Sequence, residues 1–319
     1  MTQIGNSDLD VLPLSLGGNV FGWTADRDAS FRILDSFIAG GGDFIDTADG
    51  YSAWVPGNSG GESETLIGEW LAQRKPENLV IATKVSTHPD FKGLSASNVR
   101  AAAEASLGRL GIDAIDLYYA HFDDAETPLE ETVAAFAELQ RDGLIRHTAV
   151  SNYSAERIRE WVRIADELGV ARPVAIQPHY NLVHRNDVEQ HIVPVAEEFG
   201  MGLVPYFALA SGFLTGKYRS VDADGGGSPR AGGAATYATP QGIEIIDTLE
   251  KIGNAHDASI TTTALAWLRA KPTVIAPIAS ASRVEQLTDL LASTRLDLTP
   301  DEVAELDRVS ERAPAAVSA

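Results

Sequence analysis

The sequence predicts an α/β protein built as one (β/α)8 barrel, or TIM barrel, that forms a single domain over residues 1–319. Three observations support this: short β-branched runs alternate with longer helical patterns from end to end, eight such runs are present, and no linker separates them. This alternation is typical of βαβ units on a parallel sheet, and eight units without a boundary favour a closed barrel. A doubly wound two-domain protein is the alternative topology, and no linker supports it.

The expected strands are short apolar runs such as DFIDTA, LVIATKV and AIDLYYAH. They cover residues 12–17, 43–48, 79–85, 114–121, 147–152, 174–180, 202–207 and 273–279. Amphipathic helical patterns follow many of them, for example at 30–40, 62–74, 97–111, 129–143 and 154–169. Ser97 and Ser154 stand where N-caps belong, and Gly111, Gly143 and Gly169 stand where helices should stop.

One segment departs from this alternation. Residues 211–240, after the seventh expected strand, are rich in glycine and polar residues and are too long for an ordinary connection. Two interpretations stay open. The segment is either a surface excursion without function or a flap over a long ligand, with Gly212 to Lys217 as its anchored base.

Composition limits the partners and the chemistry. The formal net charge of −20 argues against nucleic acid and anionic membranes as partners, since both would repel the chain. The absence of cysteine excludes a disulfide framework, a thiolate metal site and a cysteine nucleophile. There is no basic leader and no apolar run of about 18 residues, so we expect a cytoplasmic protein.

Four polar residues stand where expected strands give way to loops, which is where barrels place their active-site groups. Asp46 closes FIDTA with Tyr51 five residues later, Lys84 lies near the end of LVIATKV, and His121 ends IDLYYAH. A close ammonium makes a phenol a better acid, and a buried lysine needs a carboxylate to stay ionised. The four residues therefore suit polarising and protonating a carbonyl oxygen while another group attacks the carbon.

A phosphate site is expected at the far end of the chain. No GxGxxG motif follows a strand, so a Rossmann dinucleotide site is not supported. A barrel can instead bind phosphate at its last two βα loops. Ser280, Ser282 and Arg283, after the eighth strand, supply hydroxyls and a guanidinium suited to a phosphomonoester.

Seven segments together resemble the aldo-keto reductases, with a closer likeness to the bacterial, open-loop subgroup. They are DTADGY, ATKV, YYAHFDD, RDGLIRHTAVSNYS, QPHYN, LASGFLTGKY and PIASASRVEQL, in the family's order. The resemblance implies a (β/α)8 barrel that binds extended NADPH and reduces an aldehyde or ketone to an alcohol, as an alcohol dehydrogenase or carbonyl reductase. It implies Tyr51 as the general acid, Lys84 and Asp46 as its tuning pair, and His121 as the residue that orients the carbonyl.

The same resemblance implies a cofactor site along the barrel mouth. The expected cofactor-binding residues are Gly18, Asn19, Ser151, Asn152, Gln177, Tyr206, Phe207, Ala208, Leu209, Ser211, Gly212, Lys217, Ile278, Ser280, Ser282, Arg283 and Gln286. Tyr206 should stack on the nicotinamide, and Arg283 should face the 2'-phosphate. Relatives commonly read Tyr-Ser-Pro-Leu where this chain has Tyr206 to Leu209, so Phe207 takes the place of a serine, whose hydroxyl backbone N–H groups can replace.

Substrate selection is expected from the rim loops. Trp23 and Trp54 follow the first two strands and suit an apolar substrate wall, and His179 lies close enough to Gln177 to contact substrate. We expect a small carbonyl substrate, no nucleic-acid or membrane partner, no metal ion, and a monomer or weak homo-oligomer.

Three other functions are alternatives for this sequence. A Schiff-base lyase, or aldolase, would use Lys84 as its nucleophile. A non-catalytic NADPH-binding redox sensor would keep the same fold and the same four residues, as in the channel β-subunits of this family. A metal hydrolase is disfavoured, because His121, Asp123 and Asp124 lack the paired histidines that such barrels use.

Overall fold

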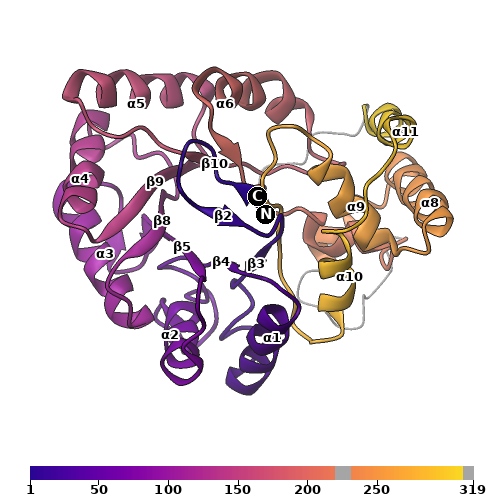
Figure 1. The fold of residues 1–319 in the computed structure, drawn as a ribbon, viewed down its shortest axis with the longest axis horizontal. Helices are drawn as coiled ribbons and strands as arrows, with labels where there is room; N and C mark the ends of the chain where they lie inside the picture. Colours follow the sequence, from indigo (N-terminus) through magenta and orange to yellow (C-terminus); the bar gives the residue numbers. More distant parts are fainter. Residues whose placement is uncertain (220–230, 312–319) are drawn as a thin grey trace.

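The computed structural model describes residues 1–219 and 231–311 of the chain. Eight parallel strands form one sheet: β3 (Ser15–Gly17), β4 (Phe44–Asp46), β5 (Val80–Val85), β8 (Ile115–Ala120), β9 (Ile145–Ser151), β10 (Ala175–Gln177), β11 (Gly202–Leu203) and β12 (Ile278–Ala279). Their order is β11-β10-β9-β8-β5-β4-β3-β12. Neighbours in the sheet are mostly neighbours among the eight units along the chain, as βαβ connections require (Figure 1).

Residues 273–279 close this sheet into a barrel. On one side Leu203 N–H donates to Thr273 O at 2.8 Å, and Ile275 N–H donates to Leu203 O at 2.8 Å. On the other side Ser15 N–H donates to Pro277 O at 3.0 Å. The expected eighth strand therefore bonds to both β11 and β3, and the predicted (β/α)8 barrel is confirmed.

Helices cover the outside of the barrel (Figure 1). The helices of the described residues are α1 (Arg27–Ala39), α2 (Glu62–Arg74), α3 (Ala96–Leu110), α4 (Leu129–Arg141), α5 (Ala155–Leu168), the π-helix η1 (Val188–Ile192), α6 (Val193–Phe199), the 3₁₀ segment η2 (Ala210–Thr215), α7 (Ala231–Ala235), α8 (Pro240–Ala255), α9 (Ile260–Arg269), α10 (Gln286–Ala292) and α11 (Pro300–Ser310).

The local signals for helix ends were mostly correct. Ser154 caps α5 by accepting a hydrogen bond from Arg157 N–H, and Gly111 and Gly169 end α3 and α5 in the left-handed conformation. Gly143 stands one residue beyond the C-cap of α4, also at positive φ. The N-cap expected at Ser97 was wrong: α3 begins at Ala96, and Ser95 holds the extended backbone that an N-cap needs.

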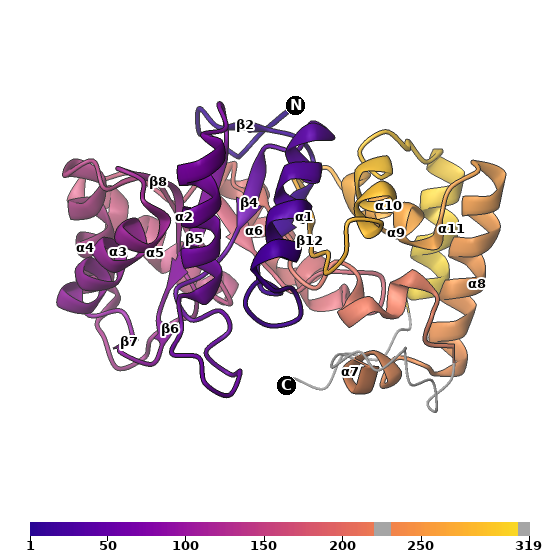
Figure 2. The same cartoon turned by 90° about the horizontal axis from the view of Figure 1, so that it is seen from below.

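Apolar side chains fill the barrel from one end. The interior cluster includes Phe44, Ala82 and Tyr119 from the strands. Ile4 and Leu9, from the hairpin of β1 (Thr2–Gln3) and β2 (Asp10–Val11), join the same cluster and plug the amino-terminal end. This hairpin lies across the ring of strands in Figure 1, and a second hairpin, β6 (Thr87–His88) with β7 (Phe91–Lys92), lies at the opposite end in Figure 2. The polar site must therefore be at the carboxyl-terminal end.

The long segment after β11 contains helices on both sides of residues 220–230. Of the expected excursion 211–240, η2 holds the first residues, α7 spans Ala231–Ala235, and α8 starts at Pro240. Residues 220–230 lie outside the described part of the chain. None of the helices within 1–219 and 231–311 is long and apolar enough to cross a membrane.

Candidate active site

The pleat of the strands sends one polar side chain from each of several strands into the barrel mouth. Along β5, Val80 and Ala82 belong to the interior cluster, whereas Ile81 and Val85 pack outward against the helices. Successive residues of a strand face opposite sides, so Lys84 continues the inward row. The same counting places Asp46 inward after Phe44 on β4, and these two groups meet because β4 and β5 are paired.

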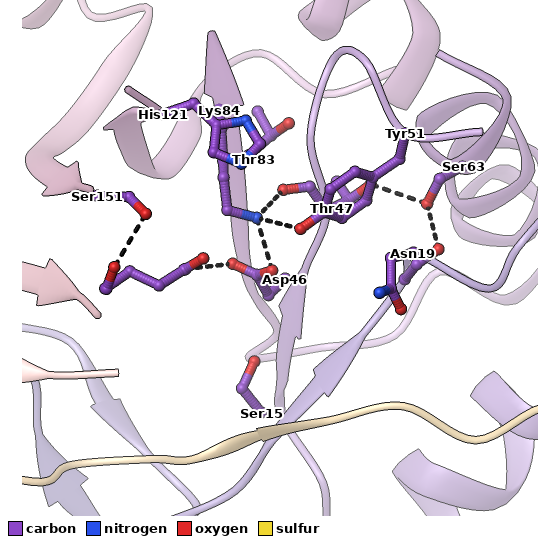
Figure 3. Close-up of polar contacts among 12 residues, drawn as sticks. Ser15, Asn19, Asp46, Thr47, Tyr51, Ser63, Thr83, Lys84, His121 and Ser151 are labelled. Atoms are coloured by element: carbon purple, nitrogen blue, oxygen red, sulfur yellow. Dashed lines mark hydrogen bonds and ion pairs between the residues drawn. The ribbon is translucent and has the colours of Figure 1, made fainter. Parts of the chain in front are cut away.

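The Lys84 ammonium has three oxygen partners (Figure 3). Its Nζ lies 2.7 Å from Asp46 Oδ2, 2.7 Å from the backbone oxygen of Thr47 and 2.9 Å from Tyr51 Oη. An ammonium has three N–H donors and no acceptor, and all three donors have a partner here. Lys84 is fully buried, so this geometry holds a complete positive charge beside the Tyr51 hydroxyl.

Asp46 compensates that charge. Its Oδ2 accepts from Lys84, and its Oδ1 accepts from Gln177 Nε2 at 2.8 Å. Both oxygens act as acceptors and one of them faces the Lys84 ammonium, which favours the carboxylate over the acid. Burial raises the pKa of Asp46 above its usual value, and Lys84 and Gln177 oppose that rise. Burial would lower the pKa of Lys84, yet Asp46 and Tyr51 outweigh it, and the net shift is upward.

His121 completes the set that the sequence predicted. It follows β8 directly, and its ring centroid lies 6.1 Å from that of Tyr51. Desolvation first, and the Lys84 charge second, hold the pKa of His121 well below its usual value. The imidazole is therefore neutral and carries one N–H donor. Asp46, Tyr51, Lys84 and His121 stand together here, as expected.

Sequence reasoning missed the groups that position these four. The Thr47 carbonyl is the third partner of Lys84, and the Thr47 hydroxyl lies 2.8 Å from Ser63 Oγ. Ser63 in turn donates to Gly18 O at 2.8 Å, and a Cβ at Gly18 would come within 2.8 Å of that hydroxyl. Gly18 therefore permits the contact that ties α2 to the loop after β3. The residue types carried no signal for it, since backbone carbonyls and small hydroxyls are common everywhere.

The loops after β8, β9, β10 and β11 are joined by a chain of amide contacts. The Asn152 amide donates to His121 O at 2.9 Å and to Ser151 Oγ at 3.0 Å, and its Oδ1 accepts from Tyr206 Oη at 2.7 Å. Ser151 donates to the backbone oxygen of Gln177 at 2.9 Å. Four residues expected to hold a nicotinamide thus lie in one connected group beside Asp46.

The segment after β11 has an unusual backbone. Three of its non-glycine residues, Phe207, Ala210 and Ser211, have φ values of 51°, 48° and 56°, and Gly212 follows at 97°. Left-handed residues among right-handed ones turn successive N–H groups toward a common side and suit a phosphate. Phe207 stands where relatives commonly carry a serine, so backbone N–H groups of this segment would have to replace that hydroxyl in binding a phosphate. Lys217, exposed just beyond η2, adds a positive charge.

The end of the eighth strand lies against the loop after the first. Ser280 Oγ donates to Asn19 Oδ1 at 2.7 Å, and Ile278 N–H donates to Pro205 O at 2.8 Å. Gln286 Oε1 accepts from the N–H groups of Ser282 and Arg283 at 2.8 and 3.1 Å. That cap organises the turn before α10 and leaves the exposed Arg283 guanidinium at the surface.

Aromatic side chains rim the mouth. The Trp23 and Trp54 rings are 5.6 Å apart, and Trp54 lies 6.2 Å from Tyr51. Trp54 is 52% exposed, and Phe122, which packs 4.9 Å from the His121 ring, is 46% exposed. On another side the His179 ring stacks with both Tyr206 and His184, with ring centroids 5.4 and 3.9 Å apart. Phe122 was not singled out from the sequence, although it directly follows His121.

The donor set fits an extended dinucleotide phosphate rather than a metal ion. Amides stand beside Asp46, a left-handed segment follows β11, and hydroxyls with a guanidinium follow β12, so polar groups cover the carboxyl ends of neighbouring strands. Within residues 1–219 and 231–311 no cluster of three or more histidine, aspartate or glutamate side chains could hold a metal ion.

Comparison with known proteins assigns the family. Residues 13–311 match the model of the aldo/keto reductase family. The chain is 33% identical to the uncharacterized oxidoreductase YrpG of Bacillus subtilis, over 93% of this chain and 91% of that protein. It is 31% identical to norsolorinic acid reductase B of Dothistroma septosporum, over 93% and 78% of the two chains. It is also 30% identical to a probable voltage-gated potassium channel subunit beta of Oryza sativa, over 98% and 97%. The chain therefore belongs to the aldo/keto reductase family of oxidoreductases.

Proposed function

We propose that the protein is an NADPH-dependent reductase that converts an aldehyde or ketone to an alcohol, an alcohol dehydrogenase or carbonyl reductase by class. The observation that carries this proposal is the Lys84 ammonium, 2.9 Å from the Tyr51 hydroxyl and 2.7 Å from the Asp46 carboxylate. A phenol beside a buried cation gives up its proton more readily, which suits a carbonyl oxygen that gains negative charge. Bound NADPH would supply the hydride to the carbonyl carbon.

The chain's own residues account for the proton. Tyr51 donates the hydroxyl proton to the carbonyl oxygen, and Lys84 stabilises the phenolate that this leaves. Asp46 keeps Lys84 charged inside the barrel, where an isolated ammonium would lose its proton. The neutral His121 ring donates an N–H to the same carbonyl oxygen and orients it toward Tyr51. Solvent at the mouth then returns a proton to Tyr51.

The cofactor would lie along the carboxyl ends of the strands. Ser151, Asn152 and Gln177 would hold the nicotinamide carboxamide, and Tyr206 would stack on the ring. The residues that would take the rest of the cofactor are Gly18, Asn19, Phe207, Ala208, Leu209, Ser211, Gly212, Lys217, Ile278, Ser280, Ser282, Arg283 and Gln286. The name of one relative, norsolorinic acid reductase B, supports a reductase rather than another use of the barrel.

The test is Tyr51→Phe, which removes one oxygen atom from the site. Wild-type protein should oxidise NADPH with at least part of a panel of aliphatic and aromatic aldehydes. The variant should lose about 10²–10⁴-fold in kcat, the range for a positioned general acid. NADPH affinity, measured by fluorescence titration, should stay within about twofold, because Tyr51 donates the proton and does not bind the phosphates. Full turnover in Tyr51→Phe would overturn the assignment.

Two alternatives give different results in the same experiments. A redox sensor is the alternative suggested by the relative named as a potassium channel subunit beta. Such a protein would bind NADPH tightly and reduce no carbonyl substrate. A Schiff-base lyase would be trapped on Lys84 by borohydride. The geometry disfavours the lyase, because all three donors of the Lys84 ammonium are engaged and no lone pair is available for attack. The single-domain organisation, the cytoplasmic location and the monomer or weak homo-oligomer stay predictions from the sequence.

A further inference from the structure

A hydroxyl group lies between a buried carboxyl group and the His121 ring. Thr87 Oγ1 is 3.3 Å from Asp49 Oδ1 and 3.4 Å from His121 Nδ1. The backbones of both neighbours are bonded to the end of β5. The backbone N–H of Asp49 donates to Lys84 O at 3.1 Å, and the backbone N–H of His121 donates to Val85 O at 3.0 Å. Thr87 Oγ1 therefore bridges the side chains of Asp49 and His121.

The hydroxyl in the middle has a single hydrogen, so its orientation couples the two ends. An ionised Asp49 only accepts, which makes Thr87 donate to it and accept from His121 Nδ1–H. A protonated Asp49 can donate to Thr87, which then donates to a bare Nδ1 of His121. Since a neutral imidazole has one N–H, the first arrangement leaves Nε2 without a proton, and the second places the proton on Nε2.

We infer that Asp49 is a positioning residue that acts through Thr87 to set which nitrogen of His121 carries the proton. This inference rests on the proposed function, in which His121 donates a hydrogen bond to the carbonyl oxygen. Only the Nε2–H form can make that donation, because Nδ1 is the nitrogen that faces Thr87. Protonated Asp49 accordingly corresponds to the active form for reduction.

The surroundings of Asp49 cause its side chain to gain or lose a proton near neutral pH. Its side chain is fully buried, and its contacts to Ser86 N–H and Thr87 Oγ1 are long, at 3.4 and 3.3 Å. Glu64 of α2 faces it with like charge, Arg109 of α3 offsets part of that charge, and the Tyr118 ring of β8 packs beside them as a neutral group. Burial first, and Glu64 second, raise the pKa of Asp49 to about 7.

The proton count balances across the change. As the pH falls, His121 Nε2 takes one proton from solvent, Nδ1 passes its proton to Thr87, and Thr87 passes its own to Asp49. The ring is neutral before and after, which agrees with the lowered pKa of His121 beside Lys84. Overall the three groups bind one proton. The His121 ring changes its tautomer and keeps its charge.

The test follows the ring nitrogens of His121 by ¹⁵N NMR in protein labelled at histidine, across about pH 5.5 to 8.5, with the signals assigned by their loss in His121→Asn. We expect Nε2–H at low pH, Nδ1–H at high pH and a midpoint near the pKa of Asp49. In Thr87→Val, which keeps the shape and removes the hydroxyl, the change should vanish. In Thr87→Ser it should return. Thr65→Val, at an exposed position of α2, is the matched control and should behave as wild type.

Kinetics supply a second measurement. Wild-type kcat/KM for carbonyl reduction should fall above the same midpoint, by up to tenfold per pH unit, and Thr87→Val should flatten that fall. A single His121 tautomer across the range, or an unaltered tautomer change in either Thr87→Val or Asp49→Asn, would overturn the inference. Failure of the proposed function is distinguishable, because it would abolish NADPH turnover and leave the NMR result intact.

Discussion

Replacing Lys84 by methionine tests the charge arrangement on which the site depends. Methionine keeps the length of the stem and removes the ammonium, so Asp46 loses the donor at 2.7 Å and remains 1% exposed. Removing one partner of a buried ion pair costs about 3–5 kcal/mol, because the other charge is left uncompensated. Folded domains have about 5–15 kcal/mol of stability in total, so Lys84→Met should lose a large share of it.

The loss of folding stability in Lys84→Met should also grow with pH. Without Lys84, burial raises the folded-state pKa of Asp46 above its unfolded value, so the native state holds the proton more tightly than the unfolded state does. Stability that depends on that proton is present at low pH and is lost as the pH rises through the folded pKa. The slope is at most about 1.4 kcal/mol per pH unit. Lys84→Met should therefore be weakened more at pH 8 than at pH 5, relative to wild type.

Denaturant unfolding, monitored by circular dichroism at the two pH values, measures both effects. Lys251→Met is the matched control, since Lys251 pairs with Glu305 at 2.8 Å with its side chain 70% exposed, and surface pairs contribute about 0–1 kcal/mol. Combining Lys84→Met with Asp46→Asn should cost less than the sum of the single changes, because no buried charge then remains unpaired. If Lys84→Met matched Lys251→Met, or showed no pH dependence, the reasoning would be refuted.

Three further predictions concern binding and titration. Arg283→Ala should weaken NADPH about tenfold and leave NADH unchanged in fluorescence titrations, because an exposed guanidinium acts on the 2'-phosphate; equal losses for both cofactors would contradict that role. Trp54→Ala should raise KM for aromatic aldehydes and leave kcat nearly unchanged, and a fall in kcat alone would argue against a substrate wall. His179, whose pKa burial and His184 lower to about 3, should give NMR signals that do not move between about pH 5 and 8, and a midpoint in that range would be inconsistent with the stacked pair.

Much of the site was predictable, because the barrel converts a local pattern into a spatial one. Lys84 and Asp46 lie 38 residues apart in the sequence, but each closes an apolar strand, and parallel strands bring their carboxyl ends to one edge. Both side chains point inward because every second residue of β4 and β5 faces the barrel interior. Ser97 shows the limit of local signals, since two serines compete for the start of α3 and the extended backbone at Ser95 decided between them.

Contacts that use ordinary groups were not predictable. The Thr47 carbonyl on Lys84, the Ser63 hydroxyl on Gly18 and the Thr87 hydroxyl between Asp49 and His121 depend on where separate loops meet. Carbonyls and hydroxyls occur along the whole chain, so residue type does not distinguish those that meet a partner. Glu64 is similar: its carboxylate looks like a solvated helix residue in the sequence, and it is buried between Thr83 and Arg109.

The sequence by itself determined the barrel, the four residues at its mouth and the family to which the chain belongs. Strand periodicity and strand-end residue types are local properties of the sequence. The parallel order of the strands then brings the strand-end residues to one end of the barrel. Only the tertiary structure decided how charge and protons are arranged: Lys84 with three oxygen partners, Asp46 held as a carboxylate, and Asp49 poised beside Thr87. These states depend on burial and on distances of about 3 Å between residues far apart in the chain, because desolvation and hydrogen bonding act over that range.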